Sequence, residues 1–169
     1  DEKIAAAGHK PVAITGEAAN ARVHLMRAMH DAILIGIGTA LSDDPLLTCR
    51  LPGLEKRSPV RVVLDRDLRL PTNSRLVRTA REVPVWVIAG LEAPAASERA
   101  LRDAGAEILR VSSDASGVGQ AAALRLLADK GITRVLVEGG PRVAASLIKA
   151  DLVDEAVLLR GSGIIGPTG

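Results

Sequence analysis

The stretch AILIGIG, Ala32 to Gly38, is a continuous apolar run that ends in two closely spaced glycines. A short run of this kind is typical of a strand that is buried on both faces, as in a parallel sheet. Glycines at its carboxyl end indicate a tight turn, and ligands of open α/β sheets gather beyond that end. The stretch therefore predicts an α/β protein with its site at the end of this strand.

Apolar segments recur on both sides of this strand, with helix-like segments between them, which is the pattern of an α/β domain. The predicted strands are residues 32–37, 60–64, 84–89, 107–111, 133–137 and 154–160. The predicted helices are residues 17–29, 94–104, 119–130 and 141–150, with Thr15 as the N-cap of the first and Gly105 at the C′ position of the second. Residues 52–59 form the best candidate for an exposed loop, and no linker divides the 169 residues, so we predict one domain.

The composition excludes several classes of function. Aromatic residues are 1% of the chain, with Trp86 as the only one, so the sequence cannot build the stacking platforms that bind single-stranded nucleic acid. The net charge of +2 comes without a basic block, which argues further against nucleic acid as a partner. No apolar run is long enough for a membrane span and no signal peptide is visible, so we expect a cytoplasmic protein without membrane contact.

Cysteine and histidine give no sign of a metal site. Cys49 is the only cysteine, which excludes an intramolecular disulfide and a multi-cysteine zinc site, and it is expected to be a packing residue. His24 and His30 are six residues apart, so they do not share a helix face as a pair of zinc ligands does. Of the 22 basic residues, 17 are arginines, which suits recognition of phosphate or carboxylate but is equally compatible with a general preference for arginine in the genome.

The first candidate site is the turn after the strand at residues 32–37. A dinucleotide fingerprint G-x-G-x-x-G begins at Gly36 but fails at Leu41, and Pro45 follows too soon for a full crossover helix. The amides of this turn, its hydroxyls and the acidic pair Asp43-Asp44 could surround a polar ligand. A plain capped turn with a solvated acidic pair explains the same residues equally well.

Two further strand ends carry candidate residues. Glu138 closes the strand at 133–137 and precedes Gly139-Gly140, after which a helix begins, so that its N-terminal amides form a natural anion site. Asp65-Arg66 ends the strand at 60–64, where an acidic residue can take ribose hydroxyls and an arginine can meet a 2′-phosphate. Tight connections without a ligand remain the alternative at both places.

Residues 39–50 resemble the T-x-x-x-D-[DN]-P-x-L-[TS]-x-R signature of the reductase domain in bacterial riboflavin biosynthesis. The order of the other segments also matches that family, including the segment VLVEGGPRVAASLIKADLVDE at 135–155. The resemblance covers residues 1–169 and implies a dihydrofolate-reductase-like α/β fold, with a mixed, mostly parallel sheet flanked by helices. It also implies an enzyme that uses NADPH to reduce the ribosyl group of 5-amino-6-(5-phosphoribosylamino)uracil to ribityl.

The resemblance carries roles onto matching residues. It implies that Arg27, Leu47, Arg50 and Glu138 face the phosphorylated substrate. It implies contacts with NADPH at Thr39, Asp43, Arg66, Gly140, Pro141, Arg142, Val143, Ala144, Ala145 and Ser146. We hypothesise that Arg50, with Arg27 nearby, binds the phosphate, and that Glu138 is the catalytic residue, which orients the pyrimidine or assists proton movement.

The chain departs from the family near its beginning. Glu2 stands where the family has Gly, Pro11 where it has Ser, and Ala13 where it commonly has Trp. A first strand that carries a Lys near the substrate, and strands after residues 163–166, lie outside this sequence, so we expect the domain at 1–169 to lack both. With Ala13 in place of Trp, the residues present offer backbone amides, arginines and aliphatic walls such as Leu47, and no aromatic stacking.

These observations predict an NADPH-dependent reductase of the riboflavin pathway, with no metal, that acts on a small phosphoribosylaminouracil. We expect a homodimer, as members of the family generally pair through their sheets, and a zinc deaminase domain fused to it or encoded next to it. Two alternatives stay open. One is a reductase of the same fold for another pyrimidine or a pterin, and the other is a noncatalytic nucleotide-binding domain.

Overall fold

A computed structural model describes residues 16–114 and 117–161. The helices are α1 (Glu17–Met29), α2 (Ile37–Asp43), α3 (Arg75–Arg78), α4 (Ala95–Asp103), α5 (Gln120–Asp129) and α6 (Pro141–Lys149), with a 3-10 turn η2 (Glu55–Arg57). The strands are β1 (Ala32–Gly36), β2 (Val60–Leu64), β3 (Val85–Gly90), β4 (Glu107–Val111), β5 (Ser113–Asp114), β6 (Gly117–Val118) and β7 (Val135–Gly139).

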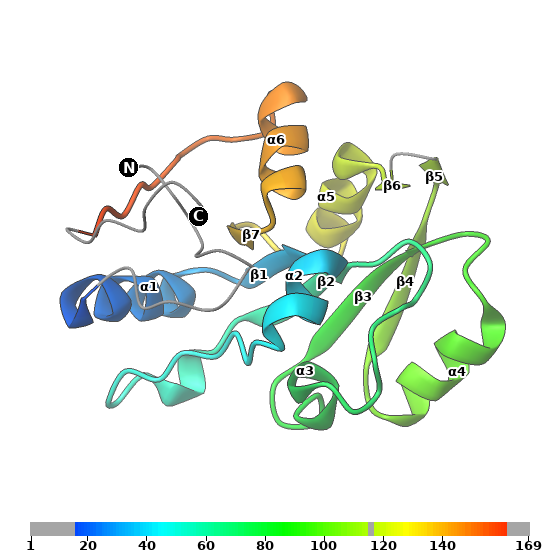
Figure 1. The fold of residues 1–169 in the computed structure, drawn as a ribbon, viewed down its shortest axis with the longest axis horizontal. Coiled ribbons are helices and arrows are strands. Elements are labelled where there is room, and N and C mark those ends of the chain that lie inside the picture. The colour runs from blue at the N-terminus through cyan, green and yellow to red at the C-terminus, as the bar shows by residue number, and fades with distance from the viewer. Residues whose placement is uncertain (1–15, 115–116, 162–169) are drawn as a thin grey trace.

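One five-stranded sheet organises the protein, in the order β4-β3-β2-β1-β7 (Figure 1). Every neighbouring pair in this sheet is parallel, and the only antiparallel pairing in the described part of the chain joins β5 to β6. Helices α3 and α4 cover one side of the sheet and α5 and α6 the other. The predicted α/β class, a mostly parallel sheet flanked by helices, is confirmed.

The core alternates along each strand, as the two-residue period of a strand requires. In β1, Ile33 and Ile35 pack with α3 and α4, whereas Ala32 and Leu34 pack with α5. All five residues of β1 are buried, as expected for the central apolar run. Trp86 on β3 is only partly buried, and its ring lies 4.8 Å from Lys130 Nζ, an arrangement typical of a cation–π contact.

Some of the predicted boundaries of helices and loops are confirmed, and others differ. Helix α1 spans the predicted residues, but Gly16 occupies its N-cap, and Thr15 lies outside the described residues together with Glu2, Pro11 and Ala13. The crossover after β1 contains the seven-residue α2, which ends at Asp43 before Pro45, as the position of that proline predicts, and the 3-10 turn η2. Residues 52–59 are largely exposed around η2, as expected of a loop.

The last strand of the sheet begins two residues later than predicted. The amides of Thr133 and Arg134 donate to Asp31 Oδ2 at 2.8 and 2.9 Å, and the Thr133 hydroxyl donates to the same oxygen at 2.7 Å. These amides are therefore satisfied by a side chain before β7 starts at Val135. The Asp31 carboxylate thus joins the beginning of β1 to the approach to β7.

The strand predicted at residues 154–160 is wrong. These residues form neither a helix nor a strand, and Val157 and Leu158 are exposed. Within the described part of the chain β7 pairs only with β1. Alternating apolar residues favour a strand, but a strand forms only where a neighbour accepts and donates its backbone hydrogen bonds, and this segment has none there.

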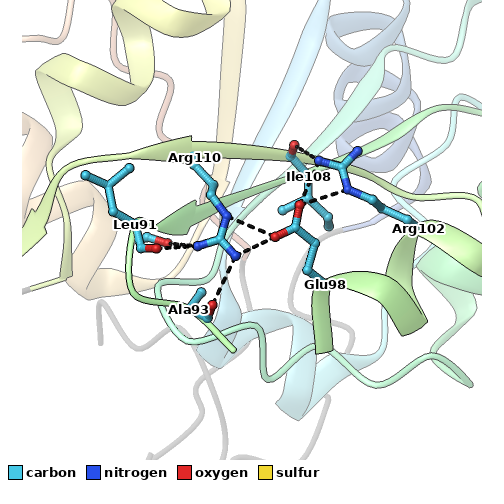
Figure 2. Close-up of polar contacts among 7 residues, drawn as sticks. Leu91, Ala93, Glu98, Arg102, Ile108 and Arg110 are labelled. Carbon is cyan, nitrogen blue, oxygen red and sulfur yellow. Dashed lines mark hydrogen bonds and ion pairs between the residues drawn. The ribbon is translucent and has the colours of Figure 1, made fainter. Parts of the chain in front are cut away.

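The opposite edge of the sheet is held by an ion-pair network between α4 and β4. Glu98 on α4 accepts from Arg102 Nε and Arg110 Nε, both at 2.9 Å, and the Arg110 guanidinium also donates to the carbonyls of Leu91 and Ala93 (Figure 2). These donors lower the pKa of Glu98, first through Arg110 and then through Arg102.

Gly105 has a φ of +102° after the end of α4, which confirms the predicted C′ glycine.

Candidate active site

A cavity of about 640 Å³ lies where β1, β2 and β7 end. Its walls come from the ends of β1 and β2, from α2, from the turn after β2, from residues 117–120 and from the first turns of α6. The lining residues are Gly36, Ile37, Gly38, Thr39, Ser42, Leu64, Arg66, Asp67, Arg69, Gly117, Val118, Gly119, Gln120, Gly140, Pro141, Arg142, Val143 and Ser146. The cavity therefore lies beyond the carboxyl ends of the strands, as AILIGIG predicted.

The shape of this cavity depends on the close approach of the backbone at Gly140 to Thr39. Gly140 has a φ of +70°, and a Cβ atom there would lie 3.1 Å from Thr39 Oγ1. Gly36 is also confined, since a Cβ would lie 2.8 Å from a methyl group of Val143 on α6. The absence of side chains thus lets α2 and the N-terminus of α6 approach each other, and leaves the first amides of α6 next to the cavity.

Most of the residues predicted to bind a cofactor lie around the cavity. Thr39, Arg66, Gly140, Pro141, Arg142, Val143 and Ser146 line it, whereas Asp43, Ala144 and Ala145 are not among the lining residues. Asp43 ends α2, and its Oδ1 accepts the hydroxyl proton of Ser42 at 2.6 Å. Ser42, one of the hydroxyl residues of the turn after β1, lines the cavity itself.

Three arginines give the cavity a basic side: Arg66, Arg69 and Arg142. Arg66 donates from Nε and Nη2 to the Asp67 carboxylate at 2.9 and 3.1 Å, and these hydrogen bonds lower the pKa of Asp67. Several guanidinium groups beside helix amides form a site for a phosphate group.

Asp65 does not have the role considered for it at the strand end. Its side chain is fully buried, and Oδ2 accepts the amide proton of Leu70 at 2.8 Å. Burial raises the pKa of this carboxyl, against the opposing effect of hydrogen bonds from the Leu70 and Arg69 amides. Asp65 therefore holds the turn after β2 from inside, and it is Arg66 that reaches the cavity.

A second group of polar residues is built on the pair Arg27–Glu138, in which Glu138 lies two residues before Gly140 of the cavity wall. Arg27 on α1 donates from Nε and Nη2 to the two carboxylate oxygens of Glu138 at 2.7 and 2.5 Å. Its Nη1 donates to the carbonyl of Thr48 at 3.0 Å. Both side chains are largely buried, at 12% and 18% exposed, so the pair is a fixed bidentate contact.

Glu138 is placed by a β-bulge in β7. Leu34 of β1 pairs with Val137 and the next residue, Ile35, pairs with Gly139, so Glu138 is an extra residue without a partner in β1. A bulge redirects a side chain at the point where it interrupts the pairing. The sequence indicated Glu138 by its place before two glycines, but nothing in the sequence pattern revealed the bulge.

Leu47 and Arg50 follow α2 on the segment that contains Thr48. Leu47 is buried and has a φ of +54°, an unusual backbone conformation for a residue with a side chain. Arg50 is exposed, and its amide donates to His24 Nδ1 at 3.2 Å. Cys49 is buried between them, as expected of a packing residue. The structure thus brings Arg27, Thr48 and Glu138 together, with His24 beside Arg50.

Residues 16–114 and 117–161 contain no group of three or more His, Cys, Asp or Glu side chains that could hold a metal ion. None of the helices in these same ranges is both long and apolar enough to cross a membrane.

Comparisons with known proteins give related names. The family described as the RibD C-terminal domain matches residues 1–169. The chain is 36% identical over 174 residues to the 2,5-diamino-6-ribosylamino-4(3H)-pyrimidinone 5′-phosphate reductase of Archaeoglobus fulgidus, covering 98% of this chain and 77% of that protein. It is 35% identical over 155 residues to the riboflavin biosynthesis protein RibD of Bacillus amyloliquefaciens, covering 92% of this chain but only 41% of that protein.

A solved structure supports the fold. The diaminohydroxyphosphoribosylaminopyrimidine deaminase/5-amino-6-(5-phosphoribosylamino)uracil reductase of Thermotoga maritima is similar with a TM-score of 0.66 and 33% identity. The match covers 88% of this chain and 38% of that one. The predicted fold class, including its dihydrofolate-reductase-like character, is thereby confirmed.

Proposed function

This chain belongs to the RibD C-terminal domain family, and on that basis we propose that it is an NADPH-dependent reductase of a phosphoribosylaminopyrimidine in riboflavin biosynthesis. The observation that carries the proposal is the juxtaposition of a cavity suited to a dinucleotide phosphate with the buried Arg27–Glu138 pair beside it. The cavity offers a place for the cofactor, and the pair offers a place for the substrate.

The residues around the cavity fit NADPH. The glycine positions at 36 and 140 leave room where a Cβ would meet Val143 or Thr39, and the amides at the start of α6 favour an anion. Arg66, Arg69 and Arg142 supply positive charge for the 2′-phosphate that distinguishes NADPH from NADH. Asp43, Ala144 and Ala145 are proposed as neighbours of this site rather than as its walls.

Glu138 is proposed to orient the pyrimidine. Arg27 occupies one side of each carboxylate oxygen, and the remaining lone pairs can accept hydrogen bonds from the N–H groups of a pyrimidine. Because the pair is fixed and largely buried, the carboxylate keeps its direction without the substrate. This preorganisation is what a reductase needs to hold a sugar carbon beside a cofactor.

Arg50 is proposed to bind the substrate phosphate. It is exposed on the segment that also carries buried Leu47, which offers an aliphatic wall. The guanidinium of Arg27 is turned toward Glu138 and Thr48, so its part in the site is to hold the carboxylate and the segment, with Arg50 as the principal phosphate ligand.

The reaction requires little acid–base chemistry from the protein. When bound, NADPH supplies the hydride that reduces C1′ of the ribosyl group after the sugar ring opens to an imine, and a proton completes the ribitylamino product. The protein binds the phosphate through Arg50, orients the pyrimidine through Glu138 and keeps both in place through Arg27. Glu138 is also proposed to assist the transfer of the proton.

A second substrate deserves a test because the relatives carry two different names. The Archaeoglobus relative, of which the chain covers 77%, is named for a 2,5-diamino-pyrimidinone, whereas the Thermotoga protein is named for an aminouracil. Both compounds are phosphorylated ribosylaminopyrimidines, so the same Arg50 and Glu138 contacts serve either. A panel with both compounds, followed by the loss of NADPH absorbance, identifies the preferred one.

Substitutions at the two substrate residues test the proposal. Arg50→Ala should raise KM roughly tenfold or more, since a charge-assisted hydrogen bond to phosphate is lost. Glu138→Gln should lower kcat/KM by roughly tenfold to a hundredfold, because the bidentate contact with Arg27 is broken and the carboxylate is neutralised. Both are measured by steady-state loss of NADPH absorbance.

Arg57→Ala is the matched control, since Arg57 is an exposed arginine on η2 and is not among the residues assigned to the site. If KM and kcat/KM are unchanged in Arg50→Ala and Glu138→Gln, the assignment of Arg50 and Glu138 to the substrate site is wrong. NADPH binding without turnover of either pyrimidine would instead identify a noncatalytic nucleotide-binding domain.

We also propose a homodimer and an association with a zinc deaminase domain. β7 is an edge strand of the described sheet, and Ile148, Val157 and Leu158 are exposed on α6 and the segment that follows it, which supports pairing at this side. The Thermotoga protein is named as both deaminase and reductase. Light scattering after gel filtration tests the dimer, with Ile148→Glu as the disrupting variant, and the sequence flanking this gene tests the deaminase.

A further inference from the structure

The segment of residues 44–50, here named the anchored segment, is held by side chains from several elements. Arg61 Nη1 on β2 donates to the carbonyl of Leu46 at 3.2 Å, and Arg27 Nη1 on α1 donates to that of Thr48 at 3.0 Å. The amide of Cys49 donates to Ser58 Oγ at 3.0 Å. The segment contains Leu47 in a left-handed conformation, which such external contacts must stabilise.

The last contact of the anchored segment involves His24. The amide of Arg50 donates to His24 Nδ1 at 3.2 Å. His24 lies on α1 three residues before Arg27, so the two side chains share one face of the helix and both reach the segment. An Nδ1 atom that accepts a hydrogen bond belongs to a neutral imidazole with its proton on Nε2.

The surroundings of His24 favour this neutral form. Burial lowers its pKa below the ordinary value, and the nearby positive charges of Arg27 and Arg50 lower it further. The Thr48 carbonyl and the Glu138 carboxylate act in the opposite direction and are weaker. At neutral pH the imidazole is therefore available as an acceptor, and acid converts it to a form that cannot accept the Arg50 amide.

We propose that His24 is a positioning residue that fixes the main chain at Arg50 and thereby aims this arginine at the substrate phosphate. The inference rests on the proposed function, since it takes Arg50 as the phosphate ligand. His24 itself touches Arg50 rather than the reacting atoms. Its loss should weaken binding of the phosphorylated substrate and leave the chemical step unchanged.

The experiment compares His24→Ala with His24→Asn. The Asn side chain places an acceptor oxygen near the position of Nδ1 but does not titrate. We expect His24→Ala to raise KM roughly fivefold with kcat unchanged, as for the loss of one hydrogen bond, and His24→Asn to restore KM to within about twofold. In an Arg50→Ala background, His24→Ala should have no further effect on KM, because its action passes through Arg50. His30→Asn, at the end of the same helix, is the control.

A second readout separates this inference from the proposed function. The amide signal of Arg50 in NMR spectra should shift with pH with a midpoint below the ordinary histidine value of about 6.5 in the wild type, and should not do so in His24→Asn. Wild-type turnover combined with an unchanged KM in His24→Ala overturns the role of His24 alone, as does an undiminished effect in the Arg50→Ala background. If the wild type reduces neither pyrimidine, the proposed function fails and the substrate role of His24 fails with it. An Arg50 amide that does not titrate in the wild type overturns the contact itself.

Discussion

Arg61 is a charged residue that β2 buries completely, on the face of the sheet that packs with α3 and α4. Its guanidinium donates to the Leu46 carbonyl, to the hydroxyl and carbonyl of Thr79, and to the carbonyl of Val83. Burial lowers its pKa to about 10, which still leaves it charged at neutral pH. One side chain thus connects the anchored segment to α3 and to the turn before β3.

Replacement of this arginine should therefore be costly. Arg61→Leu should lower the free energy of unfolding by about 3 kcal/mol, because three partly buried carbonyl groups lose their donors. Chemical denaturation measures this loss. Arg57→Leu, on the exposed η2, should change the same quantity by less than about 0.5 kcal/mol. Equal effects of the two substitutions would show that the buried contacts of Arg61 add nothing to stability.

Asp31 provides a test at acid pH. Its pKa is lowered first by the hydrogen bond from the Thr133 hydroxyl and then by the amides of Thr133 and Arg134. A lowered carboxyl pKa means that the ionised form stabilises the fold, so the contribution is complete above the unfolded value of about 3.9 and is lost as the pH falls through the folded value. Asp31 is exposed, so after solvent screening we expect about 1 kcal/mol.

The measurement is the difference in unfolding free energy between wild type and Asp31→Asn across pH 7 to about pH 3. The difference should be constant near neutrality and should shrink below about pH 4. Asp129→Asn, at the exposed end of α5, controls for the loss of a charge. A difference that grows on acidification would contradict the assignment.

Single residues show how far sequence reasoning extends. Glu138 was predicted from its place at a strand end before two glycines, because ligands of open α/β sheets gather beyond the carboxyl ends of the strands, and its role as a site residue stays a prediction. Its contact with Arg27 could not be deduced without the fold, since 111 residues separate the two. Asp65 was misjudged because a strand-end acid looks the same in sequence whether it faces the solvent or, as here, the interior.

At the scale of elements, the start of α6 determines the shape of the cavity. Gly140 combines a φ of +70° with close approach to Thr39, so a side chain there both strains the backbone and moves α6 away from α2. Gly140→Ala should weaken NADPH binding roughly tenfold, measured by calorimetry. Gly131→Ala is the matched control, since Gly131 has a φ of +87°, faces open space and lies outside the cavity.

Equal NADPH affinity in these two glycine variants would contradict the role assigned to the start of α6. A loss of stability in Gly140→Ala alone does not support this role. Both substitutions introduce a side chain at a left-handed position, so each should lower the unfolding free energy by about 1 kcal/mol. The comparison therefore isolates the contact between α6 and α2.

Helices and strands could be predicted where local sequence patterns determine them. They could not be predicted where a contact with a residue distant in sequence determines them. α1 and β1 have the expected positions because helical periodicity and a continuous apolar run are local properties. Residues 154–160 carry an apolar pattern but have no neighbouring strand in the described residues. β7 starts late because Asp31, distant in sequence, satisfies the amides just before it.

For the whole molecule, cofactor binding should appear as a gain in stability. A ligand that binds only the folded state stabilises it by about 2.7 kcal/mol at one hundred times its Kd, which raises the melting temperature of a chain of this size by several degrees. NADPH should give this increase, and NADH at the same concentration a smaller one, because the basic side of the cavity is proposed to meet the 2′-phosphate, which NADH lacks. Thermal denaturation with each nucleotide measures both.

Arg66→Ala should reduce the difference in melting temperature between the protein with NADPH and the protein with NADH, since this residue lines the cavity. If the difference in melting temperature between NADPH and NADH is unchanged in Arg66→Ala, the phosphate contact is assigned to Arg69 or Arg142 instead. An equal response to both nucleotides in the wild type would argue against selection of NADPH by this cavity.

The order of the strands has a consequence for the synthesis of the protein on the ribosome. β1, β2, β3 and β4 pair in the order in which they leave the exit tunnel, but β7 returns to the free edge of β1, and Asp31 meets Thr133 across 102 residues. During translation the apolar edge of β1 therefore stays open until residues 135–139 have emerged, which makes it a natural place for chaperones to bind. Thr39 and Gly140 come together only then, so a nascent chain acquires its ligand cavity after β1, β2, β3 and β4 have emerged.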